Sequence, residues 1–173
     1  MRILRHAALL LALLAPAAFA DGQFQVELIV FRQAGDTVPA SQPAPDDWAM
    51  GAQSIAGSER GTALNDAAAK LSPNQGYQVL LHKAWTQNLS ATPSKVSLST
   101  GDQQFGHHPV EGTVTLTQVR FTDATVELWI NQFDDNGLLT ASERVKQTAR
   151  LKNGELTYLD HSNLGLLIKI VPL

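Results

Sequence analysis

The pattern of apolar positions predicts strands at both ends of the chain. From residue 24 to residue 31, large apolar side chains occupy alternate positions, and both faces become apolar toward Phe31. This is the period of a strand that runs into the interior of a sheet. Residues 164–171 are apolar on both faces apart from Lys169, which is typical of a strand at the centre of a sheet.

A single helix is predicted over residues 58–71. Ser58 is a suitable N-cap, and Pro73 and Gly76 would end the helix. The side chains that would form its apolar face are Leu64, Ala67, Ala68 and Leu71. Alternation returns over residues 77–86, which predicts a strand directly after the helix.

Residues 34–57 lack any hydrophobic period and contain several prolines, so we expect a long Pro-rich loop there. After a polar connection, three further strands are expected. They follow a short strand at 96–98 and lie around residues 114–116, 126–130 and 141–151. Asn153-Gly154 favours a type I′ turn, which would return the chain as a hairpin into residues 155–159.

Together these elements predict the fold class α+β. We expect one domain over residues 21–173, with a mostly antiparallel sheet of five or more strands and one main helix packed on one face. The helix would cover one face, and the other would stay partly polar.

The first twenty residues have the pattern of a cleaved signal peptide. Two arginines precede the apolar run 7–14, and small residues at Ala18 and Ala20 predict cleavage between Ala20 and Asp21. A membrane-spanning helix would need about 20 apolar residues, and Pro16 interrupts the run too early. We therefore expect export to a bacterial periplasm, with no direct membrane anchor after cleavage.

Composition excludes several classes of function. The 173 residues include no cysteine, which excludes disulfides, a cysteine nucleophile, a Cys-type zinc site and a lipid-modified cysteine. The net charge is −3, and it becomes −5 once residues 1–20, which hold two arginines and no acids, are removed. An acidic chain does not favour nucleic-acid binding.

Motifs for catalysis and metal binding are weak. The nucleophile elbow G-x-S-x-G and the metal motif H-E-x-x-H are absent. Two mid-strand carboxylates, Glu27 and Glu127, could serve a wall hydrolase, or could simply lie on an open sheet face. Adjacent His107 and His108 would point apart in a strand, so we expect no metal and no cofactor.

Aromatic side chains are the other candidates for ligand contact. Trp85 and Trp129 lie in expected strands, where such residues pack well, whereas Trp48 lies in the Pro-rich loop and is the best candidate for a surface aromatic.

A family resemblance connects these features. Residues 154–172, which contain Glu155-Leu156-Thr157-Tyr158-Leu159-Asp160-His161, lead into an apolar strand and a late proline. This resembles the C-terminal E-L-H-Y-L-D-H-P pattern of the CsiV family of periplasmic peptidoglycan-binding proteins. The strand from Leu80 through His82 to Trp85 resembles the family's L-L-H-x-A-W-x-Q, and residues 26–31 resemble its first strand. Two positions depart from the pattern: Thr157 replaces a histidine and Ser162 replaces a proline.

The resemblance implies a non-enzymatic periplasmic protein whose partners are peptidoglycan and an outer-membrane lipoprotein activator of a class A penicillin-binding protein. It implies a role in cell-wall synthesis. The candidate ligand-binding residues are Trp48, His82, Trp85, Arg144, Tyr158, Asp160 and His161. Because the chain is acidic, an acidic wall polymer would have to be bound by local groups such as Arg144, Lys146 and Arg150.

Two alternatives remain open at this point. The protein could be a periplasmic adaptor that contacts only a protein partner, through a sheet edge or the Pro-rich loop. Tyr158, Asp160 and His161 could equally fix the fold at a strand end, because an aspartate there can cap a turn.

Overall fold

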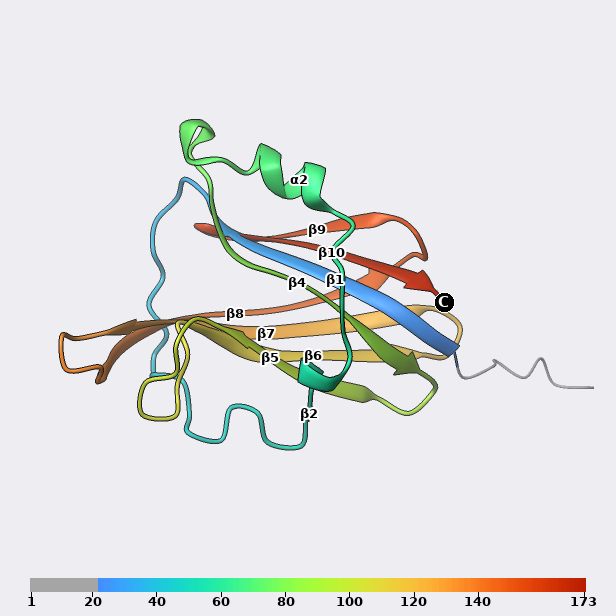
Figure 1. Ribbon diagram of the computed structural model, residues 1–173, viewed down its shortest axis with the longest axis horizontal. Helices are drawn as coiled ribbons and strands as arrows, with labels where there is room; N and C mark the ends of the chain where they lie inside the picture. Colours follow the sequence, from blue (N-terminus) through green and yellow to red (C-terminus); the bar gives the residue numbers. More distant parts are fainter. Residues whose placement is uncertain (1–21) are drawn as a thin grey trace, which may run out of the picture.

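A computed structural model describes residues 22–173. The expected signal peptide and its cleavage site at Ala20 and Asp21 lie outside the described residues. The chain folds into a sandwich of two five-stranded sheets (Figure 1). Among residues 22–173, no helix has the length and apolar character needed to cross a bilayer.

The two sheets are built from different parts of the chain. Sheet A has the order β3 (Glu59–Arg60), β4 (Gln78–Leu89), β1 (Gly22–Arg32), β10 (Leu164–Pro172), β9 (Leu156–His161). Sheet B has the order β2 (Gln53–Ser54), β5 (Ser94–Thr100), β6 (Val110–Gln118), β7 (Thr122–Phe133), β8 (Leu139–Leu151). Neighbouring strands are antiparallel except β2 and β5, which are parallel.

The core lies between the sheets. In β1 every second side chain points inward, and these residues are Phe24, Val26, Leu28 and Val30. They meet inward-facing apolar side chains of β6, β7 and β8, while Trp85 of β4 is fully buried among them. Burial of these side chains is the main favourable contribution to folding.

The two terminal strands are central, as the apolar pattern predicted. β1 pairs with β4 on one side and β10 on the other, and β10 pairs with β1 and β9. Three outward side chains of β1, those of Glu27, Ile29 and Phe31, are also buried, because the segment that contains α2 (Asn65–Lys70) lies over this face of sheet A (Figure 1).

The predicted α+β fold with one main helix is wrong. Residues 22–173 are mostly β, with 57% strand and 8% helix. The region 58–71 holds β3 and then only the six-residue helix α2, which buries no residue. Both expected leucines lie outside α2, and its only apolar residues are alanines, which offer little area to bury. Two short 3-10 turns, η1 (Ile55–Gly57) and η2 (Pro73–Gln75), complete the helical residues.

The predicted hairpin at Asn153-Gly154 is half right. Gly154 has a φ of 79°, so a turn that needs a left-handed residue does lie here. The chain nevertheless passes from β8 in sheet B to β9 in sheet A, and β9 pairs with β10. Leu159 of β9 is thereby buried in the shared core.

The Pro-rich loop crosses from sheet A to sheet B. It is fastened to β8 by a hydrogen bond of 2.7 Å from the Ala40 amide to the Ser142 carbonyl. Further along, Lys95 of β5 donates to the Met50 carbonyl at 2.9 Å, and the loop ends in β2 and η1. The loop therefore spans sheet B from β8 to β5, as the blue-green trace below the sandwich shows (Figure 1).

Candidate ligand-binding sites

The structure separates the residues that sequence reasoning grouped together. Residues directly opposite each other in antiparallel strands share a face, so the row His82, Ile29, Leu167 and Tyr158 lies on the outer side of sheet A. Arg144 lies on the outer side of sheet B, opposite Trp129. Trp85 is fully buried and donates from Nε1 to Gln87 Oε1 at 2.9 Å, so it offers a ligand no surface.

A hollow of about 400 Å³ lies where the Pro-rich loop meets β7 and β8. We call it the Trp129 hollow; its walls are Glu127, Trp129, Arg144 and residues 40–43 and 45 of the loop. The Arg144 guanidinium lies 5.6 Å from the centre of the Trp129 ring. Its Nε donates to Glu127 Oε1 at 3.0 Å, and its Nη2 makes a second, short contact with the same oxygen.

Glu127 stays ionised at neutral pH. Burial by itself would raise the pKa of this carboxyl, but hydrogen bonds and positive charge from Arg144 and Lys146 outweigh burial and lower the pKa. Lys146 Nζ lies 3.3 Å from Glu127 Oε2. One carboxylate in the wall of the hollow therefore lies between two cations.

The cations continue along β8. Arg144, Lys146 and Arg150 alternate with inward-facing residues, so they project from the same side of the strand, and we call these three residues the basic strip. Their side chains are 46%, 54% and 59% exposed. Arg150 lies 4.3 Å from the centre of the Phe121 ring and 3.2 Å from Asp123. The strip thus combines exposed cations with neighbouring aromatic side chains.

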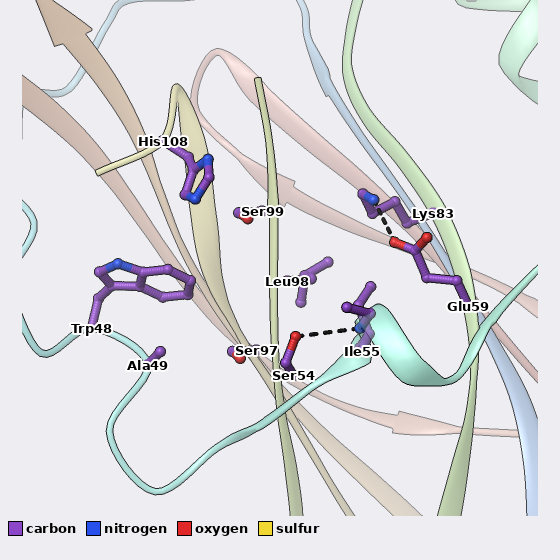
Figure 2. A pocket seen from close by; sticks show the side chains of 11 residues that line it. Trp48, Ala49, Ser54, Ile55, Glu59, Lys83, Ser97, Leu98, Ser99 and His108 are labelled. Atoms are coloured by element: carbon purple, nitrogen blue, oxygen red, sulfur yellow. Dashed lines mark hydrogen bonds and ion pairs between the residues drawn. The ribbon is translucent and has the colours of Figure 1, made fainter. Parts of the chain in front are cut away.

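A second hollow, of about 370 Å³, lies beside β5 near the edge of sheet B, and we call it the edge hollow (Figure 2). Trp48 and His108 line one part of it. Lys83 and Glu59 line the other part and form an ion pair of 2.6 Å. Leu98 and its neighbouring serines on β5 lie between these two groups (Figure 2).

A buried polar cluster joins the Pro-rich loop to sheet B. Glu111 is fully buried and accepts hydrogen bonds from His107 Nδ1 at 2.7 Å, the His108 amide at 2.7 Å and Asn131 Nδ2 at 2.8 Å. His107 Nε2 reaches Asp46 of the loop at 3.3 Å. Burial would lower the pKa of His107, but the Glu111 and Asp46 carboxylates outweigh it and raise the pKa.

His82 belongs to a structural contact on sheet A. Its Nε2 lies 2.7 Å from Glu27 Oε1, and Glu27 also accepts from the Ala63 and Leu64 amides at 2.9 and 2.8 Å. Glu27 is only 3% exposed. These contacts hold the segment before α2 against the outer face of β1.

Tyr158 and Asp160 form a second contact on the same face. The Tyr158 hydroxyl donates to Asp160 Oδ1 at 2.7 Å, and Gln33 Nε2 donates to the same oxygen at 2.7 Å. The Tyr158 hydrogen bond is the largest influence that lowers the pKa of Asp160. The Tyr158 ring, 49% exposed, stacks on Phe31 with 6.3 Å between ring centres. The cluster ties β9 to the end of β1.

His161 is separate from its neighbours Tyr158 and Asp160. It is opposite Leu164 in the β9–β10 register, on the inward side of β9. Its charge helps to lower the pKa of Glu143, after larger contributions from burial, which raises it, and from Arg32 and Asn163.

Trp48 and Arg144, both proposed from the sequence, line the two hollows, but Glu111, Lys83 and Glu59 were not singled out from the sequence. Nothing in the local pattern marks Glu111, because a carboxylate in an alternating strand normally lies on the solvent side. Lys83 and Glu59 are likewise brought together only by the pairing of β3 with β4.

Comparison with known proteins gives one positive result. No curated protein and no solved structure matches the chain. The family model described as "Peptidoglycan-binding protein, CsiV" matches residues 4–63 and 52–173, which together cover nearly the whole sequence. The chain therefore belongs to the CsiV family, whose description is that of peptidoglycan-binding proteins.

Proposed function

We propose that this chain is a non-catalytic periplasmic protein that binds peptidoglycan through the basic strip and the Trp129 hollow, and thereby supports cell-wall synthesis. The observation that carries the proposal is the position of the strip. Arg144, Lys146 and Arg150 project together from β8 in a protein that is acidic as a whole. Family membership supports the same ligand class.

The chemistry of the wall fits these side chains. Peptide stems of peptidoglycan carry carboxylates, which arginine binds with two parallel N–H donors. The glycan carries hydroxyl and N-acetyl groups that suit a hollow with an aromatic wall and a few polar groups. Local recognition of this kind does not need a positive net charge.

The two carboxylates considered for a hydrolase are poorly suited to catalysis. Glu27 is buried and already accepts two backbone N–H groups beside His82. Glu127 has a lowered pKa, so it holds no proton to donate at neutral pH. They also lie on opposite outer faces of the sandwich, which keeps them from acting as a pair on one bond.

Pelleting with purified sacculi tests the proposed site. The double variant Arg144→Gln, Lys146→Gln removes two cations from the strip, and Lys70→Gln, Lys152→Gln removes two elsewhere at equal net charge. We expect the first to lower the pelleted fraction at least fivefold and the second to match the wild type. Equal pelleting of the two double variants would remove the strip from the proposal, and wild-type protein found wholly in the supernatant would refute wall binding.

Release of muropeptides tests the non-catalytic part. Wild-type protein and the Glu27→Gln, Glu127→Gln double variant should release equal, background amounts from sacculi over many hours. Release by the wild type that the double variant abolishes would make the protein a wall hydrolase.

Export and partnership complete the proposal. The N-terminal pattern supports cleavage after Ala20, so protein isolated from the periplasm should begin at Asp21. The family resemblance supports assistance to an outer-membrane lipoprotein activator of a class A penicillin-binding protein. Affinity capture from detergent extracts, with and without digestion of the wall, tests this. Capture that survives digestion while sacculus pelleting fails would favour the alternative, a protein adaptor with no direct wall binding.

A further inference from the structure

The edge hollow lies where one side of β5 is only partly paired with another strand. β5 pairs with β6 along its whole length, but on its other side the two-residue strand β2 pairs only with Val96 and Ser97. Ser97, Leu98 and Ser99 of β5 are lining residues of the hollow. Part of β5 therefore lacks a neighbouring strand on one side, and this part lines the hollow.

The direction of the backbone groups shows which residue of β5 has an unpaired N–H and C=O in the hollow. In an antiparallel ladder, successive residues turn their N–H and C=O groups to opposite sides. The amide of Gln118, in β6, donates to the carbonyl of Ser90, on the side of β5. The carbonyl of Pro109, just before β6, accepts instead from the amide of Asn131 in β7. Even-numbered residues of β6 therefore turn their backbone N–H and C=O groups toward β5. Leu98 and Thr100 are opposite such residues, so their own backbone groups point toward β6.

Ser99 consequently turns its N–H and C=O groups toward the hollow. Among residues 22–173, no loop or turn hydrogen bond reaches these two groups. An extended peptide that enters the hollow can pair with them as a further strand, in continuation of β2. The same kind of pairing is already made by β2 two residues upstream.

The two parts of the hollow suit the alternating side chains of such a peptide. Leu98 faces the core side of sheet B, toward Lys83 and Glu59, whereas Ser99 faces the outer side, toward Trp48 and His108 (Figure 2). Successive side chains of a strand point to opposite faces. Groups on one face of the bound peptide would therefore meet the Lys83–Glu59 ion pair, and groups on the other face would meet the Trp48 ring.

We propose that the edge hollow binds the peptide stem of peptidoglycan, in extended form, by pairing with Ser99. This inference rests on the proposed function and names the part of the wall polymer that is bound at this place. A volume of about 370 Å³ is that of a small-ligand site, and one open residue is too short an edge for a whole protein strand.

The ion pair indicates which residue of the stem lies there. Lys83 Nζ and Glu59 Oε1 are 2.6 Å apart, with side chains 28% and 47% exposed, so both charges remain accessible to a ligand. A group that carries an ammonium and a carboxylate on one carbon complements such a pair. The free end of a diaminopimelate side chain has this structure, whereas a lysine side chain has only the ammonium.

Calorimetry with the tripeptide L-alanyl-γ-D-glutamyl-meso-diaminopimelate tests the proposal. Ser99→Pro removes the open N–H without removing a ladder bond, and proline is tolerated at such edge positions. Ser99→Ala keeps the N–H and serves as its control. We expect Ser99→Pro to weaken binding at least tenfold and Ser99→Ala to change it less than twofold, with unchanged thermal midpoints confirming that both variants are folded.

A ligand comparison gives a second arm that does not depend on the proline variant. The wild type should bind the diaminopimelate tripeptide at least fivefold more tightly than its L-lysine analogue, and the Lys83→Met, Glu59→Gln variant should lose this preference. The Lys152→Met, Glu155→Gln variant removes a distant, exposed ion pair and should keep the preference.

The outcomes separate this inference from the proposed function. Sacculi that pellet the protein while the tripeptide does not bind would overturn the edge-hollow proposal and leave wall binding intact. A linear tetrapeptide of L-alanines that binds as tightly as the tripeptide would also overturn it, since the site would then accept a protein segment instead of the stem.

Discussion

Replacing Arg32 by methionine should destabilise the protein substantially, because it leaves a carboxylate buried without its main partner. Glu143 is 3% exposed and lies between the sheets. Arg32 donates to both of its oxygens, from Nη1 at 3.2 Å and Nη2 at 2.7 Å, and Asn163 Nδ2 donates at 2.9 Å. After the substitution, only the Asn163 hydrogen bond remains.

The magnitude follows from the burial of the two partners. Removing one partner of a buried ion pair costs about 3–5 kcal/mol. The Arg32 side chain is 31% exposed, so water can replace part of its contact, and we expect a loss of about 2–3 kcal/mol in the free energy of unfolding. With a urea m value of about 2 kcal/mol/M, the unfolding midpoint should fall by about 1–1.5 M.

The pH dependence gives this prediction a second, independent readout. Because Arg32 and Asn163 outweigh burial, the folded pKa of Glu143 is lowered, so its stabilising contribution is present above the unfolded pKa and is lost as pH falls through the folded pKa. The difference between wild type and Arg32→Met should therefore shrink as pH falls below about 4. Adding Glu143→Gln to the variant should recover part of the loss at pH 7. A midpoint shift below about 0.3 M, or a difference that does not change with pH, would refute the reasoning.

Three further predictions concern packing and protonation. A Cβ at Gly165 would lie 2.3 Å from the Phe31 ring, so Gly165→Ala should cost about 1–3 kcal/mol of stability, measured by urea unfolding, and an unchanged midpoint would contradict the close packing. The pKa of His107 is raised in the folded protein, so its stabilising contribution is full below the unfolded pKa of about 6.5 and is lost as pH rises through the folded pKa. The substitution His107→Gln should therefore lower the free energy of unfolding more at pH 6 than at pH 9. Trp85→Phe should cost about 2 kcal/mol or more, because it opens a void and removes a buried donor, while Trp48→Phe should cost less than about 0.5 kcal/mol by circular dichroism.

The strands were largely predictable because their signal is local. Alternation in β1 and the apolar run of β10 reflect burial on one or both faces, and each needs only the residues of its own segment. The division into two sheets could not be read in this way. Asn153-Gly154 specifies a turn whichever sheet the next strand joins, and that choice depends on where Leu159 finds buried space.

The predicted helix was wrong for a related reason. Leucines and alanines at helical spacing over 58–71 satisfy the pattern, but a helix needs a large apolar face to be stabilised by packing. The contacts that order this segment are instead backbone amides of Ala63 and Leu64 held by the Glu27 carboxylate, more than thirty residues away. The same limit applies to the candidate site, where Trp48 could be proposed from its loop but the Lys83–Glu59 pair could not.

The charge distribution leads to a last prediction, on ionic strength. If residues 1–20 are removed on export, as proposed, the protein carries a net charge of −5 and should be repelled by a wall polymer rich in carboxylates, while the basic strip attracts the same polymer at short range. Screening lengths are about 30 Å at 0.01 M salt, 10 Å at 0.1 M and 3 Å at 1 M. At low salt the whole acidic molecule contributes to the repulsion, and at high salt the strip itself is screened. The pelleted fraction should therefore be largest at intermediate salt for the wild type, and this maximum should disappear in the Arg144→Gln, Lys146→Gln variant. If the pelleted fraction instead falls steadily as salt is added, attraction outweighs repulsion at every distance. That result would contradict the idea that a local strip binds the polymer while the rest of the protein repels it.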